Sequence, residues 1–218
     1  QLSKLEIKQG VFKVTFCIYK YKITMKLFMT VILIPNEKME KVDVIVVGSG
    51  ISGLSFSIKL AGKRNDLSIV IFTKAENNES NTRYAQGGIA GVFNLKEDSF
   101  QAHIQDTLQA GGIECNRDIV EKIIRSAPER IAELESWGVN FTKDVNGNNS
   151  AALEGGHSFP RVIHAKDATG NEIENVLIQK IKSCPNITIL NHFEVIELLK
   201  KQDEIDGVKV LDKKQNSI

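Results

Sequence analysis

An apolar run followed at once by three spaced glycines constrains the fold of this chain more than any other feature. Residues 42–47, Val-Asp-Val-Ile-Val-Val, have the composition of a strand buried on both faces of a parallel sheet. Gly48, Gly50 and Gly53 follow with the spacing Gly-x-Gly-x-x-Gly. In this motif the first glycine permits a tight turn, the second lets a pyrophosphate approach the backbone, and the third lets a helix pack on the strand.

The flanking residues support this interpretation of the motif. The apolar spacing from Ile51 to Ala61 predicts a helix that ends near Gly62 and whose first amides face an anion. Residues 67–72 predict the next parallel strand. This order predicts a Rossmann-like α/β domain with a parallel sheet. The candidate residues for binding a dinucleotide are Gly48, Ser49, Gly50, Ile51, Ser52 and Gly53.

The end of the second strand does not favour NAD. An acidic residue usually stands there to bind the ribose hydroxyls, but this chain has Thr73-Lys74. Lys74 is a candidate for contacting phosphate or ribose oxygens, and a solvated loop charge is an equally good interpretation.

Residues 77–91 are polar and glycine-rich without helical or strand periodicity, which predicts a long loop. Because long loops in compact domains usually serve a function, ligand binding is a suitable role for it. Short polar side chains precede small ones, which leaves room for a flat ring against the backbone. An ordinary surface loop is the alternative. The candidate cofactor-binding residues of this loop are Asn81, Thr82, Arg83, Tyr84, Ala85, Gln86, Gly87 and Gly88.

The glycine-rich turn and the Thr-x-x-Ala-Gln-Gly-Gly of residues 82–88 together resemble the succinate dehydrogenase and fumarate reductase flavoprotein family. The resemblance runs from about residue 42 to about residue 199 and includes Glu-Gly-Gly-His-Ser at 154–158 and His-Ala-Lys-Asp-Ala-Thr-Gly at 164–170. It implies FAD as the cofactor. Members of the family with covalent FAD carry a histidine where this chain has Asn81, so the resemblance implies non-covalent FAD, as in the members that oxidise L-aspartate.

In those aspartate-oxidising members the glutamate of Glu-Gly-Gly-His-Ser orients the amino group of the substrate, a role that the resemblance assigns to Glu154. It implies oxidation of L-aspartate to iminoaspartate, with oxygen or fumarate as electron acceptor, on the quinolinate route to NAD. The alternatives are a fumarate reductase or succinate dehydrogenase flavoprotein, or a non-catalytic flavin-binding module. His157 and His164 are expected to pack or order loops, and His103 to lie on a helix surface.

Composition excludes several other classes of protein. The net charge is +1 and the basic residues are dispersed, which argues against nucleic-acid binding. Cys17, Cys115 and Cys184 are far apart, which argues against a disulfide framework or a metal site and favours a reducing compartment such as the cytoplasm. The apolar run at residues 27–34 is too short to span a bilayer, so no membrane association is expected.

We expect two parts in the chain. Residues 1–40 are expected to be an N-terminal extension outside the fold, with Met39 as the natural start. Residues 41–218 are expected to form the FAD-binding domain, which includes an antiparallel β excursion, is incomplete at the C-terminus and is inactive without the capping domain of its family. Periodicity and turn signals predict helices at 98–109, 118–137 and 171–182, a strand at 187–190, and a strand pair at 193–199 and 208–211 that turns at Asp206-Gly207.

Overall fold

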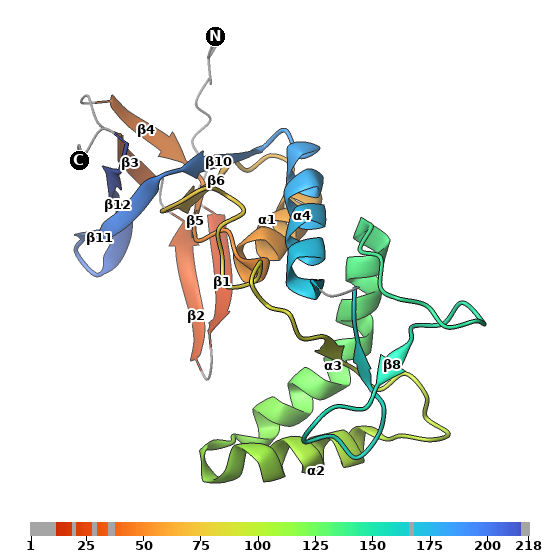
Figure 1. Cartoon of the computed structure of the whole chain (residues 1–218). Coiled ribbons are helices and arrows are strands. Elements are labelled where there is room, and N and C mark those ends of the chain that lie inside the picture. Colours follow the sequence, from red (N-terminus) through yellow and green to blue (C-terminus); the bar gives the residue numbers. More distant parts are fainter. Residues whose placement is uncertain (1–11, 19–20, 28–29, 35–37, 166–167, 215–218) are drawn as a thin grey trace. The chain divides into compact units, whose positions relative to one another are not determined.

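A computed structural model describes residues 12–18, 21–27, 30–34, 38–165 and 168–214 of the chain (Figure 1). Backbone contacts divide the chain into two compact units. The first unit combines residues 1–49, 56–77 and 184–218, and the second combines residues 50–55 and 78–183.

A parallel sheet forms the centre of the first unit. It consists of β5 (Val44–Val47), β6 (Ile69–Thr73) and β10 (Ile187–Asn191) in the order β10-β6-β5. Helix α1 (Ile51–Lys63) connects β5 to β6, which confirms the predicted strand–helix–strand unit. All residues of β6 are buried, as expected for the middle strand of a covered parallel sheet.

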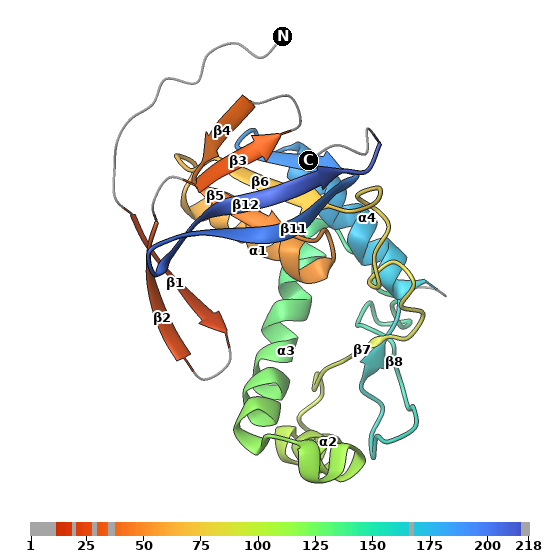
Figure 2. The ribbon, with the colours of Figure 1, turned by 90° about the vertical axis from the view of Figure 1, so that its left-hand side faces the viewer.

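A second sheet covers one face of this parallel sheet (Figure 2). It contains β11 (Phe193–Lys201), β12 (Glu204–Asp212), β3 (Thr30–Ile34) and β4 (Lys38–Val42) in that order. Strands β1 (Phe12–Ile18) and β2 (Tyr21–Leu27) form a separate antiparallel pair. The parallel sheet and the four-stranded sheet share a core of buried residues, namely Val42, Val70, Phe72, Val208 and Val210.

The predicted antiparallel pair is confirmed, but the predicted position of its turn is wrong. The chain turns between β11 and β12, where Gln202 adopts a φ of 57°. Asp206 and Gly207 lie inside β12 instead, and Gly207 pairs with both Leu199 and Val31. Pairing on both sides fixes Gly207 in the sheet, and this non-local contact outweighs its local turn preference. The assignment of residues 1–40 to an extension stays a prediction.

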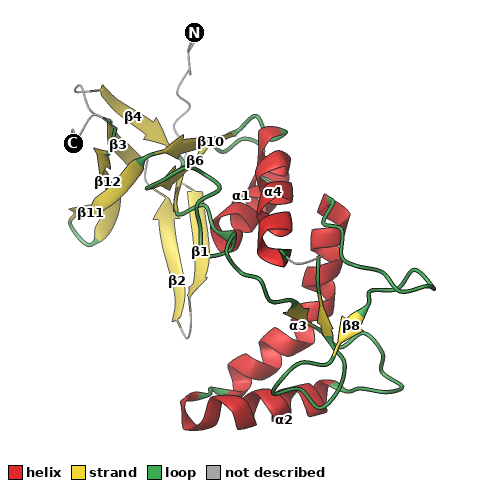
Figure 3. Cartoon of the chain, in the orientation of Figure 1, coloured by secondary structure: helices red, strands yellow, loops and turns green. Residues whose placement is uncertain are grey.

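The second unit contains three α-helices and a small sheet among its described residues (Figure 3). The helices are α2 (Phe100–Gly111), α3 (Arg117–Trp137) and α4 (Thr169–Lys182), with a 3₁₀ turn, η1 (Gly112–Glu114), after α2. The sheet has the order β7-β9-β8 and is built from β7 (Ile89–Ala90), β9 (Val162–Ile163) and β8 (Ala151–Ala152).

Local signals set the ends of these helices. The Ser99 side chain accepts a hydrogen bond from the Ala102 amide at the start of α2, and Asn116 does the same for two amides of α3. Gly138 ends α3 with a φ of 112°, a conformation that favours glycine. Pro128 lies within α3 without ending it. Within the described part of the chain, no helix combines the length and apolar character needed to cross a membrane.

Candidate functional site

The glycine-rich turn begins in the first unit, at the carboxyl end of β5. Gly48 adopts a φ of 100°, and its amide donates to the Phe72 carbonyl of β6 at 2.8 Å. This left-handed conformation explains why a glycine stands there. The buried Ser49 hydroxyl donates to the Thr73 hydroxyl at 3.1 Å. Because β5 and β6 are parallel, exposed Lys74 follows at the same edge of the sheet as this turn.

The rest of the turn belongs to the second unit, where it meets the 80–88 loop. The Ile51 amide, in the first turn of α1, donates to the Thr82 hydroxyl at 3.1 Å. A Cβ on Gly50 would lie 3.5 Å from the same hydroxyl oxygen. The structure therefore brings the predicted residues Gly50, Ile51 and Thr82 together, although their positions are far apart in the sequence.

Helix α4 holds the 80–88 loop from its other side. The Gly170 amide donates to the Ala85 carbonyl at 3.0 Å, and a Cβ on Gly170 would lie 1.8 Å from the Thr82 carbonyl oxygen. One helical turn later, buried Glu174 accepts a hydrogen bond from the Ser80 hydroxyl. Burial raises the pKa of Glu174, and the hydrogen bond from Ser80 opposes part of that rise. The loop is thus fixed at its backbone while most of its side chains stay exposed.

The two glycines at the end of this loop have different surroundings. A Cβ on Gly87 would meet nothing within 4 Å, so one side of its backbone is open to a ligand. A Cβ on Gly88 would lie 2.4 Å from the Ile163 carbonyl oxygen and 2.9 Å from Cε1 of His164. Gly88 is therefore required by close packing against β9, and Gly87 is not.

Glu154 lies in an exposed turn that follows β8. Its carbonyl accepts from the His157 amide at 3.2 Å, and Gly156 has a φ of 82°. The Glu154 side chain is 44% exposed, and its Oε1 lies 2.9 Å from Nε2 of His164. This pair of side chains has no signal in the sequence, where the two residues are ten positions apart in an irregular segment.

A buried ion-pair network stands beside this turn. Arg161, which is 0% exposed, donates to both carboxylate oxygens of Asp98 at 2.9 and 2.6 Å and to Asp106 at 2.7 Å. Asp106 also accepts from the amide and the hydroxyl of Ser158, at 2.8 and 2.7 Å. The network ties helix α2 to the turn that carries Glu154. No sequence pattern marked Arg161, because an arginine next to a short apolar segment is ordinarily exposed.

The network shifts the pKa values of its neighbours. Burial would raise the pKa of Asp106, but the hydrogen bonds from Ser158 and Arg161 outweigh it and lower the pKa to about 2. Burial, together with the charges of Arg161 and His157, lowers the pKa of His103 to about 4. The expectation that His103 lies on a helix surface is wrong. It is 5% exposed, packs edge-on against His157 at 5.4 Å between ring centres, and its Nδ1 lacks a hydrogen-bond partner among the described residues.

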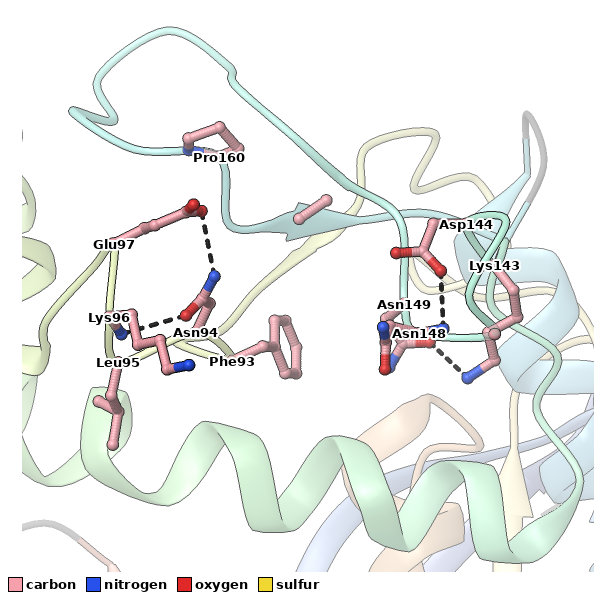
Figure 4. A pocket seen from close by; sticks show the side chains of 12 residues that line it. Phe93, Asn94, Leu95, Lys96, Glu97, Lys143, Asp144, Asn148, Asn149 and Pro160 are labelled. Atoms are coloured by element: carbon pink, nitrogen blue, oxygen red, sulfur yellow. Dashed lines mark hydrogen bonds between the residues drawn. The ribbon is translucent and has the colours of Figure 1, made fainter.

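The described residues of the second unit line two cavities of note, and neither of these is lined by the predicted cofactor or substrate residues. The larger, of about 870 Å³, lies between residues 93–97 and 143–151 (Figure 4). Its polar groups already pair with each other: Lys143 donates to Asn149 at 2.7 Å, and Asn94 donates to Glu97 at 3.0 Å. The smaller, of about 420 Å³, is lined by Asp106, Gln109, Ala110, Gly156, His157 and Ser158. Cavity size alone therefore does not identify the site.

The residues present fit a flavin dinucleotide. Gly48 and Gly87 each expose backbone to open space, where a Cβ would meet no atom within 4 Å. The start of α1 follows the glycine-rich turn, which is the usual position for a pyrophosphate. The 80–88 loop adds small side chains and an open backbone beside Gly87, which suits a flat ring.

The chain belongs to the FAD-binding domain family, since the family described as "FAD binding domain" matches residues 43–218. It is similar to L-aspartate oxidase 2-a, chloroplastic, of Nicotiana tabacum, with 42% identity over 164 residues that cover 75% of this chain and 25% of the relative. It is also similar to L-aspartate oxidase of Acinetobacter baylyi, with 36% identity over 184 residues that cover 81% of this chain and 33% of the relative. The chain thus spans about a quarter to a third of the length of these relatives.

Solved structures with the same fold include flavoproteins of the predicted family. E. coli quinol fumarate reductase superposes with a TM-score of 0.74 and 27% identity, covering 78% of this chain and 29% of that one. Sdh1 of Mycobacterium smegmatis superposes with a TM-score of 0.72 and 32% identity, covering 78% of this chain and 30% of that one. These findings confirm the predicted fold class and the FAD cofactor. The roles of individual residues stay predictions.

Proposed function

We propose that this chain is the FAD-binding part of an enzyme that oxidises L-aspartate to iminoaspartate. The similarity to curated L-aspartate oxidases at 36–42% identity is the observation that carries this proposal. Oxygen or fumarate would accept the electrons, and the product would enter the quinolinate route to NAD. The absence of a covalent-flavin histidine at Asn81 and the presence of a carboxylate at Glu154 support the aspartate-oxidising branch of the family.

In this proposal the glycine-rich turn and the 80–88 loop bind FAD. Backbone amides of the glycine-rich turn and the start of α1 would bind the pyrophosphate, because the helix dipole favours an anion there. Lys74 would contact ribose or phosphate oxygens. The backbone of residues 85–88 would lie against the flat ring, because α4 and β9 hold that segment in place. Bound FAD supplies the acceptor for a hydride from the substrate.

Glu154 would orient the amino group of the substrate. Its carboxylate is half-exposed in an open turn, so a charged amine can reach it. A carboxylate attracts an ammonium, and a dicarboxylate without an amine would lack this attraction. This difference would favour aspartate over succinate. A substrate held in this way presents its Cα hydrogen for transfer, and the protein contributes position and charge.

The direct test uses the full-length gene product, purified with its flavin under anaerobic conditions. L-Aspartate should bleach the flavin absorbance near the long-wavelength maximum, and succinate at the same concentration should bleach it far more slowly. A flavoprotein that only succinate reduces would overturn the proposal in favour of a succinate-oxidising enzyme. Loss of both responses would favour a non-catalytic flavin-binding module.

The fumarate reductase alternative rests on the solved structures with the same fold. Members of the family with covalent FAD attach the flavin through a histidine, and the amide of Asn81 cannot form that bond. A test for covalently bound flavin therefore bears on the choice between the two hypotheses. Acid precipitation of the holoprotein should release FAD into the supernatant. Flavin that stays in the pellet would contradict the proposal of a dissociable cofactor.

The cellular compartment is a further proposal. The widely separated cysteines support the cytoplasm or another reducing compartment. The similar plant proteins carry the description chloroplastic. Fluorescent tagging of the intact gene product in its own cells distinguishes these locations.

A further inference from the structure

We infer that His164 is a positioning residue for Glu154, and that it helps the site to prefer an amino-dicarboxylate over a plain dicarboxylate. This inference rests on the proposed function and adds a residue to it. The observation behind it is the contact between His164 Nε2 and Glu154 Oε1 at 2.9 Å. At this distance the ring nitrogen and the carboxylate oxygen are in direct polar contact.

The His164 backbone is fixed by its neighbours in the small sheet. His164 directly follows β9, the middle strand of the β7-β9-β8 sheet, and its carbonyl accepts from the Thr142 amide at 2.8 Å. The Glu154 side chain comes from the exposed turn after β8, where the His157 amide donates to the Glu154 carbonyl. The sheet thus fixes the histidine backbone, and the ring can hold the glutamate side chain through their contact.

The imidazole also lies against the flavin-binding loop. Its Cε1 would be 2.9 Å from a Cβ on Gly88, so glycine at position 88 leaves the space that the ring occupies. One ring thus contacts a residue predicted to bind the cofactor and a residue predicted to bind the substrate. The sheet explains this arrangement, because Gly88 precedes β7 and Ile89 of β7 pairs with Ile163 of β9.

The contact with His164 involves one carboxylate oxygen and leaves the other for a ligand. Within the described part of the chain, Oε2 of Glu154 makes no hydrogen bond. The His164 side chain is 27% exposed, so it is partly shielded while Glu154 is open. The polar contact with the ring nitrogen restrains the position of the carboxylate at Oε1. The charged Oε2 then faces an incoming ammonium with a defined orientation.

The test compares His164→Phe with His164→Gln in the full-length enzyme loaded with FAD. Phenylalanine keeps a flat ring near Gly88 but removes the donor, whereas glutamine keeps an N–H donor of similar reach. We expect the Phe variant to lose about tenfold more kcat/KM for L-aspartate than for fumarate, mainly through KM. The Gln variant should recover most of that loss. The dissociation constant for FAD, from flavin fluorescence, should change by less than about threefold in the Gln variant.

A double-mutant cycle with Glu154→Gln separates positioning from general damage. In the Glu154→Gln background, His164→Phe should change the aspartate KM by less than about twofold, because the charge it orients is already absent. Equal losses for aspartate and fumarate, or a full effect of His164→Phe in that background, would overturn the inference. His164→Asn, too short to reach Glu154, gives the same comparison if the Phe variant does not fold.

The outcome for the wild-type enzyme keeps this inference separate from the proposed function. If the wild type does not oxidise aspartate, the proposed function fails. If it does oxidise aspartate and His164→Phe leaves the aspartate-to-fumarate ratio unchanged, only the role of His164 fails.

Discussion

At the scale of single residues, two adjacent glycines of the 80–88 loop differ in whether there is space for a side chain at their position. A Cβ on Gly88 would clash with the Ile163 backbone, so Gly88→Ala should destabilise the protein by about 1–3 kcal/mol. A Cβ on Gly87 has open space, so Gly87→Ala should leave the stability of the flavin-free protein within about 0.5 kcal/mol. Urea denaturation measures both values.

The same pair tests where the flavin lies. If the ring lies against the backbone at Gly87, Gly87→Ala should weaken FAD binding by about tenfold or more, although it barely changes stability. Titration of the flavin-free protein followed by flavin fluorescence measures this. A Gly87→Ala variant that binds FAD as the wild type does would contradict the proposed position of the ring.

Glu154 offers a second prediction at this scale. In the full-length enzyme, Glu154→Gln should lower kcat/KM for L-aspartate by about tenfold to a hundredfold, because the neutral amide no longer attracts the ammonium. Fumarate reduction should change much less, since fumarate carries no amine. Steady-state kinetics with both substrates checks this, and parallel losses would rule out the amine-orienting role.

Residues with a motif around them could be predicted from the sequence, and isolated ones could not. The glycines at 48, 50 and 53 have separate steric roles that their spacing reveals. His103 and Arg161 gave no such signal, because their burial depends on partners from distant segments. Asp98 and Asp106 flank or lie in α2, and their convergence on Arg161 exists only in three dimensions.

At the scale of elements, His103 of helix α2 is a buried titratable residue that packs against His157 in the turn after β8. The pKa of His103 falls from 6.5 to about 4 on folding, so the unfolded chain binds a proton more readily between these values. The contribution of His103 to the free energy of unfolding is therefore fully present above about pH 6.5. It declines as the pH falls toward 4, by up to about 3 kcal/mol.

Replacing His103 by phenylalanine should remove this part of the pH dependence while keeping a ring beside His157. The free energy of unfolding, measured in urea at pH 7, 5 and 4, should fall less steeply for His103→Phe than for the wild type. The contribution of Asp106, whose folded pKa is about 2, is present above pH 4 and is lost below it, so it lies outside this window. An unchanged slope between pH 7 and 4 would show that His103 is not the group responsible.

Long elements were predictable from the sequence and short ones were not. The strands and helix from 42 to 73, helices α2, α3 and α4, and strands β10 to β12 carry clear periodicity or turn signals. Strands β7, β8 and β9 have two residues each, which is too few for an alternation to be recognised. These short strands nevertheless place Gly88, His164 and the turn of Glu154 at the ends of strands of one sheet.

At the scale of the whole molecule, the predicted cofactor residues are divided between two compact units. Gly48, Ser49 and Lys74 belong to the first unit, while Gly50–Gly53 and residues 81–88 belong to the second. The chain covers about a quarter to a third of its curated relatives, so the enzymatic proposals concern the full-length protein. We propose that both glycine-rich segments bind one FAD.

A crystal structure of the full-length protein with its bound flavin tests that claim most directly. We expect pyrophosphate oxygens within about 3 Å of amides in residues 49–52, and the flavin ring in contact with the backbone of residues 85–88. The ring should carry no covalent bond to Asn81. An FAD that contacts only one of these two segments, or neither, would contradict the account.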